Sequence, residues 1–201
     1  MNTATSRRAL FRTLLNPIAN STTSTQNVGG TARPDNLTDR QLASRFLAQA
    51  ALGANSALID DVTSMGIEAW LDAQFNMPQS QILEAIYTIF PESDLATGSP
   101  DRSIFRYALW DAMMLGDDLL RQRVALALSE IFVISTESSD LYSFANGIGG
   151  WYDMLLKNAF GNFRELLYDV TMSPIMGTYL SHAGNRKTDE AKGLFPDENY
   201  A

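Results

Sequence analysis

The chain has 201 residues, 45% of them hydrophobic and 19% charged, which is the composition of a globular protein of one domain or a large part of one. It has no cysteine, so disulfides, thiolate nucleophiles and metal sites built on cysteine are excluded, and no stretch approaches the roughly 18 uninterrupted apolar residues of a membrane span. The net charge of −8 makes the chain a poor nucleic-acid binder, because contact with phosphate backbones needs a basic surface.

Residues 1–36 differ from the rest of the chain in charge and pattern. Residues 1–40 carry a net +3, which leaves −11 on the remainder, and the polar, glycine-bearing run 19–30 is typical of a disordered linker. We therefore predict a disordered basic tail over residues 1–36. The run Ser6–Arg12 resembles a twin-arginine export signal, but Arg12 interrupts an apolar segment that is shorter than such signals have. Two interpretations stay open: a cytoplasmic protein with a basic tail, or one exported through this weak signal.

From Thr38 onward, apolar residues recur every three or four positions, the spacing of amphipathic helices. Thr38 is of a type that caps helices, and Ser99 before Pro100 has the pattern of a cap followed by a first-turn proline. In the first half of the chain we therefore predict helices from Thr38 to about Ala50, over about 57–64, after Gly66 with Trp70, Leu71 and Phe75 on one face, over about 79–90, and from Pro100 to Gly116.

The second half of the chain continues the helical pattern. Asp117 and Asp118 favour the positive N-terminal end of a helix that runs to about Ser135, and its apolar run 131–134 is predicted to lie deep in the core. A glycine-rich stretch, 146–150, is expected to interrupt the chain before a helix over 151–160. Further helices are expected to start at the caps Asn162 and Ser173, the second leading to His182.

No run of alternating strand residues occurs anywhere in the sequence. Residues 37–201 are therefore predicted to form one all-α domain, an irregular multi-helix orthogonal array with no sheet, preceded by the disordered tail.

The best candidate for chemistry is a polar cluster near the C-terminal end of the chain. It combines the only histidine with a lysine, carboxylates and amides, groups that hydrolytic or metal sites use; oxygen ligands suit Mg²⁺ or Ca²⁺, and a histidine widens the choice of cation. Its spacing matches no ligand motif, so the alternative is a histidine that is favoured by a helix C-terminus and lies beside a solvated loop. The cluster consists of His182, Asn185, Lys187, Asp189, Asp197, Glu198 and Asn199.

A second candidate is the charged group Arg121, Arg123 and Glu130 in the predicted helix 117–135. Arg123 and Glu130 are seven residues apart and so share a helix face, where an arginine–carboxylate pair could hold an anion or a catalytic acid. The alternative is an ion pair that fixes helix packing. The tryptophans, the tyrosines and the pair Met113–Met114 lie at core spacing and are interpreted as packing.

Four blocks of the sequence resemble a known family. They are ASRFLAQA at 43–50, AWLDAQF at 69–75, RQRVALALSEIF at 121–132 and PDENYA at 196–201. Their length and order make the chain similar, over about 39–201, to the bacterial domain-of-unknown-function 1800 family, whose members are large, mostly helical and often exported. The resemblance implies no agreed activity. Family members continue for hundreds of residues beyond the last block, so we expect an N-terminal part of a larger domain, with residues 197–201 frayed.

Two function classes follow from these features. The first is a non-catalytic binding or scaffold module of an exported or envelope-associated system, with a protein partner on its acidic and aromatic helix faces. The second is a hydrolase-type or metal-dependent enzyme with His182 as base and Asp197 or Glu198 as acid or ligand, its site completed by a missing C-terminal part. The sequence identifies no cofactor, although a divalent cation fits the second class. The first class needs fewer assumptions and is the one we favour.

Overall fold

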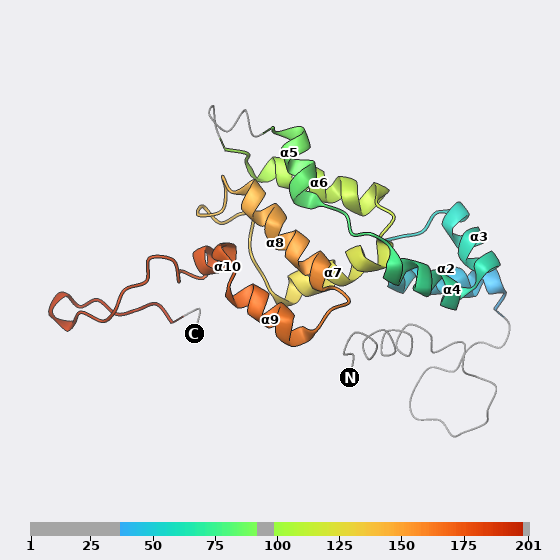
Figure 1. Ribbon diagram of the computed structural model, residues 1–201. Helices are drawn as coiled ribbons and strands as arrows, with labels where there is room; N and C mark the ends of the chain where they lie inside the picture. The colour runs from blue at the N-terminus through green and yellow to red at the C-terminus, as the bar shows by residue number, and fades with distance from the viewer. Residues whose placement is uncertain (1–36, 92–98, 199–201) are drawn as a thin grey trace, which may run out of the picture. The chain divides into compact units, whose positions relative to one another are not determined.

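The computed structural model describes residues 37–91 and 99–198. Within these two ranges the chain is helical and forms no sheet, and the β-type pairing found there is an isolated antiparallel bridge between Asp189 and Leu194 (Figure 1). This confirms the prediction of an all-α fold. No helix in the described ranges is long and apolar enough to cross a membrane. The predicted tail and its twin-arginine-like run lie outside the described residues.

The chain divides into two compact units. Unit 1 contains the described residues 37–78 together with 117–123, and unit 2 contains the described residues of 79–116 and 124–198. Unit 1 is built from α2 (Asp39–Ala50), α3 (Ser56–Met65), α4 (Ile67–Asn76) and the first residues of α7 (Leu119–Ile131). The remaining residues of α7 belong to unit 2.

Local sequence signals set the helices of unit 1. Thr38 caps α2 as predicted, because its hydroxyl accepts from the backbone amide of Gln41 while the Gln41 side chain accepts from the amide of Thr38. Asn55 caps α3 by a single bond, its side-chain oxygen accepting from the backbone amide of Leu58 at 2.9 Å. The apolar face of α4 buries Trp70 edge-on against the ring of Phe46, with ring centroids 5.3 Å apart. These helices therefore follow from signals that are readable in the sequence.

A buried glutamine, Gln74, fastens α4 to the start of α7 within unit 1. Its side chain is 4% exposed, its Nε2 donates to the carbonyl of Asp117 at 2.9 Å, and its Oε1 accepts from the amide of Leu120 at 3.0 Å. The amide of Leu120 belongs to the first turn of α7, where the helix itself offers no acceptor. Gln74 thus acts as a helix cap supplied from 46 residues away in the sequence, which no local pattern could predict.

Unit 2 is arranged around α8. Figure 1 shows α8 between the pair α5 and α6 on one side and α9 and α10 on the other, and α8 contacts all four. Its buried side chains include Ile148, Trp151, Tyr152, Leu155 and Leu156. The helices of this unit are α5 (Ile82–Ile89), α6 (Arg102–Leu115), the rest of α7, α8 (Ala145–Asn158), α9 (Phe163–Thr171), α10 (Pro174–Tyr179) and a short 3₁₀ helix (Glu190–Lys192).

The prediction of a glycine break before α8 is wrong. The helix begins at Ala145 and runs through Gly147, Gly149 and Gly150. A Cβ atom at Gly149 would lie 2.5 Å from Cδ1 of Ile86 on α5, and one at Gly147 would lie 2.5 Å from Cδ1 of Ile175 on α10. The glycines therefore let the two neighbouring helices approach α8 closely, and this packing outweighs a propensity cost of about 1 kcal/mol for each glycine.

An aspartate on α8 caps α5. The carboxylate of Asp153 accepts from the backbone amides of Ile82 at 2.7 Å and Leu83 at 3.0 Å, which are the first two residues of α5. Gln81, which precedes α5, makes no side-chain cap. Burial raises the pKa of the Asp153 carboxyl above its usual 3.8, while the two backbone hydrogen bonds act in the opposite direction. The helix start is thus defined by a residue about 70 positions along the chain.

Several predicted boundaries and faces are also wrong. Asp101, not Ser99, caps α6, and the carbonyl of Pro100 accepts from the amide of Ala145 instead of opening the helix. Helix α7 ends at Ile131, and the apolar run 131–134 is not deeply buried, because Ile131 is 67% exposed and Val133 is also exposed. Met114 is exposed on α6 as well. An apolar residue stays exposed wherever no neighbouring helix covers its face, which periodicity alone does not reveal.

Two glycines of α8 give a matched test of its packing. We expect Gly149→Ala to lower the free energy of unfolding by about 1 kcal/mol or more, because its methyl group must displace the fully buried Ile86. A Cβ at Gly150 would approach nothing nearer than Leu83 Cδ2 at 4.0 Å, so Gly150→Ala should raise the same free energy by roughly 0.5–1 kcal/mol. Urea denaturation followed by circular dichroism measures both. Stabilisation by both alanines would contradict close packing at Gly149.

The Asp153 cap is tested by removing its acceptor. Asp153→Ala leaves two partly buried backbone amides without a partner, so we expect a loss of about 2–4 kcal/mol in the free energy of unfolding. Asp111→Ala, at an exposed position on α6, is the matched control and should change stability by no more than about 0.5 kcal/mol. Equal effects of the two substitutions would exclude a capping role for Asp153.

The raised pKa of Asp153 also predicts a pH dependence. A carboxyl whose pKa is higher in the folded state holds its proton more tightly there, so its contribution to stability is complete below pH 3.8 and is lost as the pH rises through the raised value. The stability of the wild type relative to Asp153→Asn, which cannot ionise, should therefore fall over this window. Denaturation midpoints of both proteins measured from pH 3.5 to 7 give the comparison, and a relative gain with rising pH would show that the two hydrogen bonds outweigh burial.

Candidate functional site

The predicted C-terminal cluster lies in an exposed segment that follows α10. His182 comes three residues after Tyr179, the last residue of α10, and directly after Ser181, whose φ of 61° ends the helical path. Asn185 and Asp197 are brought together: Nδ2 of Asn185 donates to the carbonyl of Asp197 at 2.7 Å, and Oδ1 of Asn185 accepts from the Asp197 amide at 3.0 Å. The Asn185 side chain therefore fastens the backbone of the segment at Asp197. The expected fraying of residues 197–201 stays a prediction, because residues 199–201 lie outside the described ranges.

The other members of the cluster do not converge. Asp189 forms an ion pair with Lys192 at 2.9 Å, while Lys187 and Glu198 are exposed, and Asn199 lies outside the described residues. Residues 195–198 are in neither helix nor strand, so the predicted helix opening at Pro196 is not formed within the described part. Across residues 37–91 and 99–198, no group of three or more histidine, aspartate or glutamate side chains could hold a metal ion. The cluster is a fastened loop in this structure.

The charged group of α7 separates into different contacts. In unit 1, Nε of Arg123 donates to the carbonyl of Gln49 at 3.3 Å, and Nη2 of Arg121 donates to the carbonyl of Met77 at 3.3 Å. Both carbonyls lie at C-terminal ends of helices, where a cation is favoured. Seven residues of helix span about 10 Å, too far for Arg123 to pair directly with Glu130. The predicted arginine–glutamate pair is therefore not formed, and the arginines hold backbone carbonyls instead.

Glu130 lies on the wall of a cavity in unit 2. The cavity has a volume of about 190 Å³, is partly open to solvent, and is bordered by α6, the unit 2 part of α7, the segment that follows α7, and α8. We call it the unit 2 cavity. Most of its lining is apolar or aromatic, as expected for a small-molecule site. The lining residues are Phe105, Leu109, Leu126, Ser129, Glu130, Val133, Ile134, Thr136, Ile148, Trp151 and Tyr152.

The polar groups of the unit 2 cavity are few. Glu130 is the one lining side chain that is charged at neutral pH. Ser129 donates its hydroxyl proton to the carbonyl of Leu126 at 2.7 Å, which leaves its oxygen able only to accept. Trp151 is 4% exposed, and within the described residues its buried indole Nε1 has no hydrogen-bond partner.

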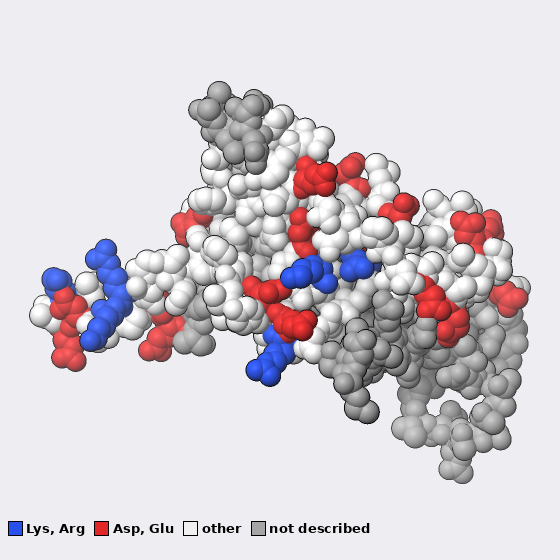
Figure 2. Space-filling view, viewed as in Figure 1, with Lys and Arg blue, Asp and Glu red and all other residues white. Residues whose placement is uncertain are grey.

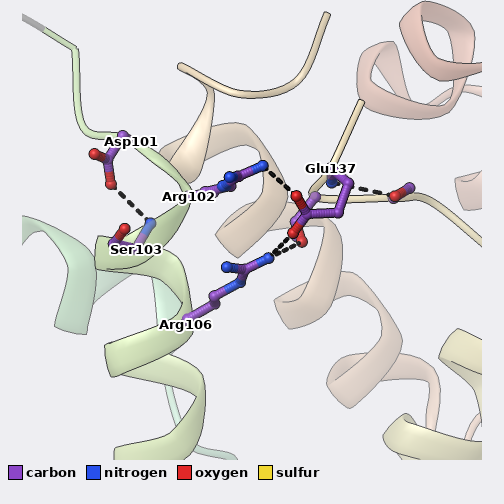
Figure 3. Close-up of polar contacts among 7 residues, drawn as sticks. Asp101, Arg102, Ser103, Arg106 and Glu137 are labelled. Atoms are coloured by element: carbon purple, nitrogen blue, oxygen red, sulfur yellow. Dashed lines mark hydrogen bonds and ion pairs between the residues drawn. The ribbon is translucent and has the colours of Figure 1, made fainter. Parts of the chain in front are cut away.

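Two arginines of α6 hold the segment at the rim of the cavity (Figure 3). Nη1 of Arg102 pairs with Oε2 of Glu137 at 2.5 Å, and Nη2 of Arg106 pairs with the other carboxylate oxygen. The same Nη2 donates to the hydroxyl of Thr136 at 3.1 Å, and Thr136 lines the cavity. We call these contacts the rim clamp. Because Glu137 and Arg106 are exposed and Arg102 is half-buried, each ion pair contributes no more than about 1 kcal/mol, but together they fix the position of residues 136–137.

The comparison with known proteins gives one family. The family model described as "Protein of unknown function (DUF1800)" matches residues 45–201. The chain belongs to this family. No curated protein and no solved structure matches it. The match covers every residue that lines the unit 2 cavity and both arginines of the rim clamp, so the site lies inside the DUF1800 region.

A second hollow of this DUF1800 chain is an open apolar groove in unit 2 with a volume of about 450 Å³. Its lining offers little polar chemistry, so it has the character of a contact surface rather than a reaction site. Figure 2 shows acidic side chains scattered over the visible face, with basic ones in small groups among them. The expected lack of a nucleic-acid partner stays a prediction. The groove is lined by Ile131, Phe132, Val133, Val170, Thr171, Met176, Tyr179 and Leu180.

Sequence reasoning named one residue of the cavity, Glu130, and missed the others. Trp151 was interpreted as core packing, which describes its burial but not the cavity beside it. Part of the rim clamp could have been found in the sequence. Arg102 and Arg106 are four residues apart and so present two cations on one face of α6. Their partner, Glu137, is 31 residues beyond Arg106 and lies outside any helix, so only the structure brings the three together.

Proposed function

We propose that this DUF1800 member is a binding module and that the unit 2 cavity is its ligand site. The observation that carries the proposal is a cavity of about 190 Å³ with a mainly apolar and aromatic lining. A cavity of about 150 Å³ lined by leucine, isoleucine and phenylalanine is enough to hold benzene. The ligand class that this volume supports is a single aromatic ring or a short branched alkyl chain with one polar group.

The chemistry of the lining supports binding rather than catalysis. General acid–base catalysis uses a positioned acid and a positioned base, and the lining offers one carboxylate, Glu130, with no histidine, lysine or second carboxylate beside it. The hydroxyl of Ser129 donates to the Leu126 carbonyl, so a base does not activate it as a nucleophile. A site of this kind can select a ligand by shape and one charge.

Three finer parts of the expected function stay predictions. An exported or envelope-associated setting rests on Arg7 and Arg8, which lie outside the described residues. The alternative of a hydrolase-type or metal-dependent enzyme rests on the residue types of His182, Asp197 and Glu198, and it needs further groups to complete a site. A scaffold role would use the apolar groove, whose lining includes the exposed Ile131 and Val133, which suit a protein partner.

The binding proposal is tested with benzyl alcohol, which has one ring and one hydroxyl, and with the three tryptophan indoles as reporters. Trp151 lines the cavity, Trp110 is exposed on α6, and Trp70 is buried in unit 1. We expect saturable shifts of the Trp151 indole resonance in ¹H–¹⁵N NMR spectra, with a Kd on the order of 1 mM, which corresponds to about 4 kcal/mol. Trp70 and Trp110 should not shift. Tryptophan-to-phenylalanine variants assign the three resonances.

A cavity-blocking variant makes the same test specific. Leu126 and Leu128 are both half-buried on α7, but only Leu126 lines the cavity. Leu126→Phe should weaken benzyl alcohol binding at least tenfold because the ring takes the ligand's volume, whereas the matched control Leu128→Phe should leave the Kd within about twofold of the wild type. Unaltered binding by Leu126→Phe, or no Trp151 shift in the wild type, would rule out the cavity as the site.

A further inference from the structure

The unit 2 cavity has a charge preference as well as a size. We infer that its ligand is a small organic amine in the ammonium form, with the cationic group at Glu130 and the apolar part among Phe105, Trp151 and Tyr152. The inference rests on the proposed function, because it needs the cavity to be a ligand site. It adds the chemical class of the ligand, which the shape of the cavity alone does not give.

The first support comes from the acceptors of the lining. Glu130 provides the one ionised group, and it is a carboxylate with two acceptor oxygens. The neighbouring Ser129 has committed its proton to the Leu126 carbonyl, so its oxygen is left to accept. Two adjacent positions of α7 therefore offer acceptors to the cavity. An ammonium group carries three donors and no acceptor, which is the complement of such a pair.

The second support comes from the aromatic side chains. Phe105 on α6 and Tyr152 on α8 meet edge to face with ring centroids 6.4 Å apart, and Trp151 lies beside Tyr152 in the sequence of α8. All three line the cavity. The faces of aromatic rings carry negative partial charge and attract cations, most strongly for tryptophan. The rings therefore favour an ammonium ion over a neutral ligand of the same shape and disfavour a carboxylate.

The rim clamp limits the size of this preference. Arg106 reaches the cavity through Thr136, and Arg102 lies on the same clamp, so the two guanidinium groups are balanced by one carboxylate, Glu137. Their net positive charge repels an ammonium ion. Glu130 lines the cavity but is exposed, as Arg106 and Glu137 are, so solvent screens its attraction for the ammonium ion as well as the repulsion from the clamp. We therefore expect a preference of several-fold rather than one of several orders of magnitude.

The test compares three probes of nearly one shape at pH 7: benzylamine as cation, benzyl alcohol as neutral ligand and benzoate as anion. Kd values are read from the Trp151 indole resonance of the full chain. We expect benzylamine to bind about three- to tenfold more tightly than benzyl alcohol at low ionic strength, and benzoate to bind more weakly than both. The ratio between benzylamine and benzyl alcohol should shrink in 0.5 M NaCl because salt screens the Glu130 charge.

Glu130→Gln keeps the shape of the side chain and removes its charge, so it should bring the ratio of the two Kd values close to one. Glu165→Gln is the matched control, an exposed carboxylate of α9 that does not line the cavity, and it should leave the ratio unchanged. Circular dichroism confirms that both variants fold.

The possible results separate this inference from the proposed function. Equal binding of benzylamine and benzyl alcohol, tighter binding of benzoate, or a full preference retained in Glu130→Gln overturns the ammonium assignment while benzyl alcohol binding still supports a ligand site. If none of the three probes shifts the Trp151 resonance, the proposed function and the inference fall together.

Discussion

Unit 2 depends on the contact between α5 and α8, and that contact is set by one carboxylate. Asp153 accepts from the first two amides of α5, groups that would otherwise be buried without a partner. Gly149, one turn earlier on α8, removes the side chain that would keep Ile86 away. The Asp153 cap determines where α5 begins, and Gly149 determines how closely α5 approaches α8. Both features are needed. Without the cap, the first amides of α5 would have no partner, and without the close approach, α5 and α8 would not pack tightly.

The unit 2 cavity follows from the same arrangement. Helix α8 meets α5 at Gly149 and α10 at Gly147, and its large side chains Trp151 and Tyr152 line the cavity together with residues of α6 and α7. Helix α7 ends at Ile131, and the segment that follows it completes the border of the cavity. The rim clamp then holds residues 136–137 on α6. Different contacts therefore hold the walls of the cavity in place, and this gives the cavity a defined shape.

The sequence predicted what depends on neighbours in the chain and missed what depends on distant residues. Thr38 and Asn162 cap their helices as expected, since a cap needs only the next few amides. Asp153 and Gln74 cap helices from 71 and 46 residues away in the sequence. The role of the α8 glycines depends on the close approach of Ile86 and Ile175, which the sequence does not show. For the site, Glu130 was identified by its residue type, but its expected partner, Arg123, holds a carbonyl of unit 1 instead. A cavity has no sequence signal, because it is the space that packing leaves unfilled.

The central claim is that α6, α7 and α8 border a partly open cavity that small apolar molecules can enter. A crystal of the full chain held under xenon pressure tests this most directly, because xenon occupies apolar cavities and needs no particular hydrogen bond. The account predicts a xenon atom in the unit 2 cavity among Phe105, Leu126 and Ile148, with Glu137 still held by the two arginines of α6. Side chains that fill this space, with no xenon bound there, would contradict it.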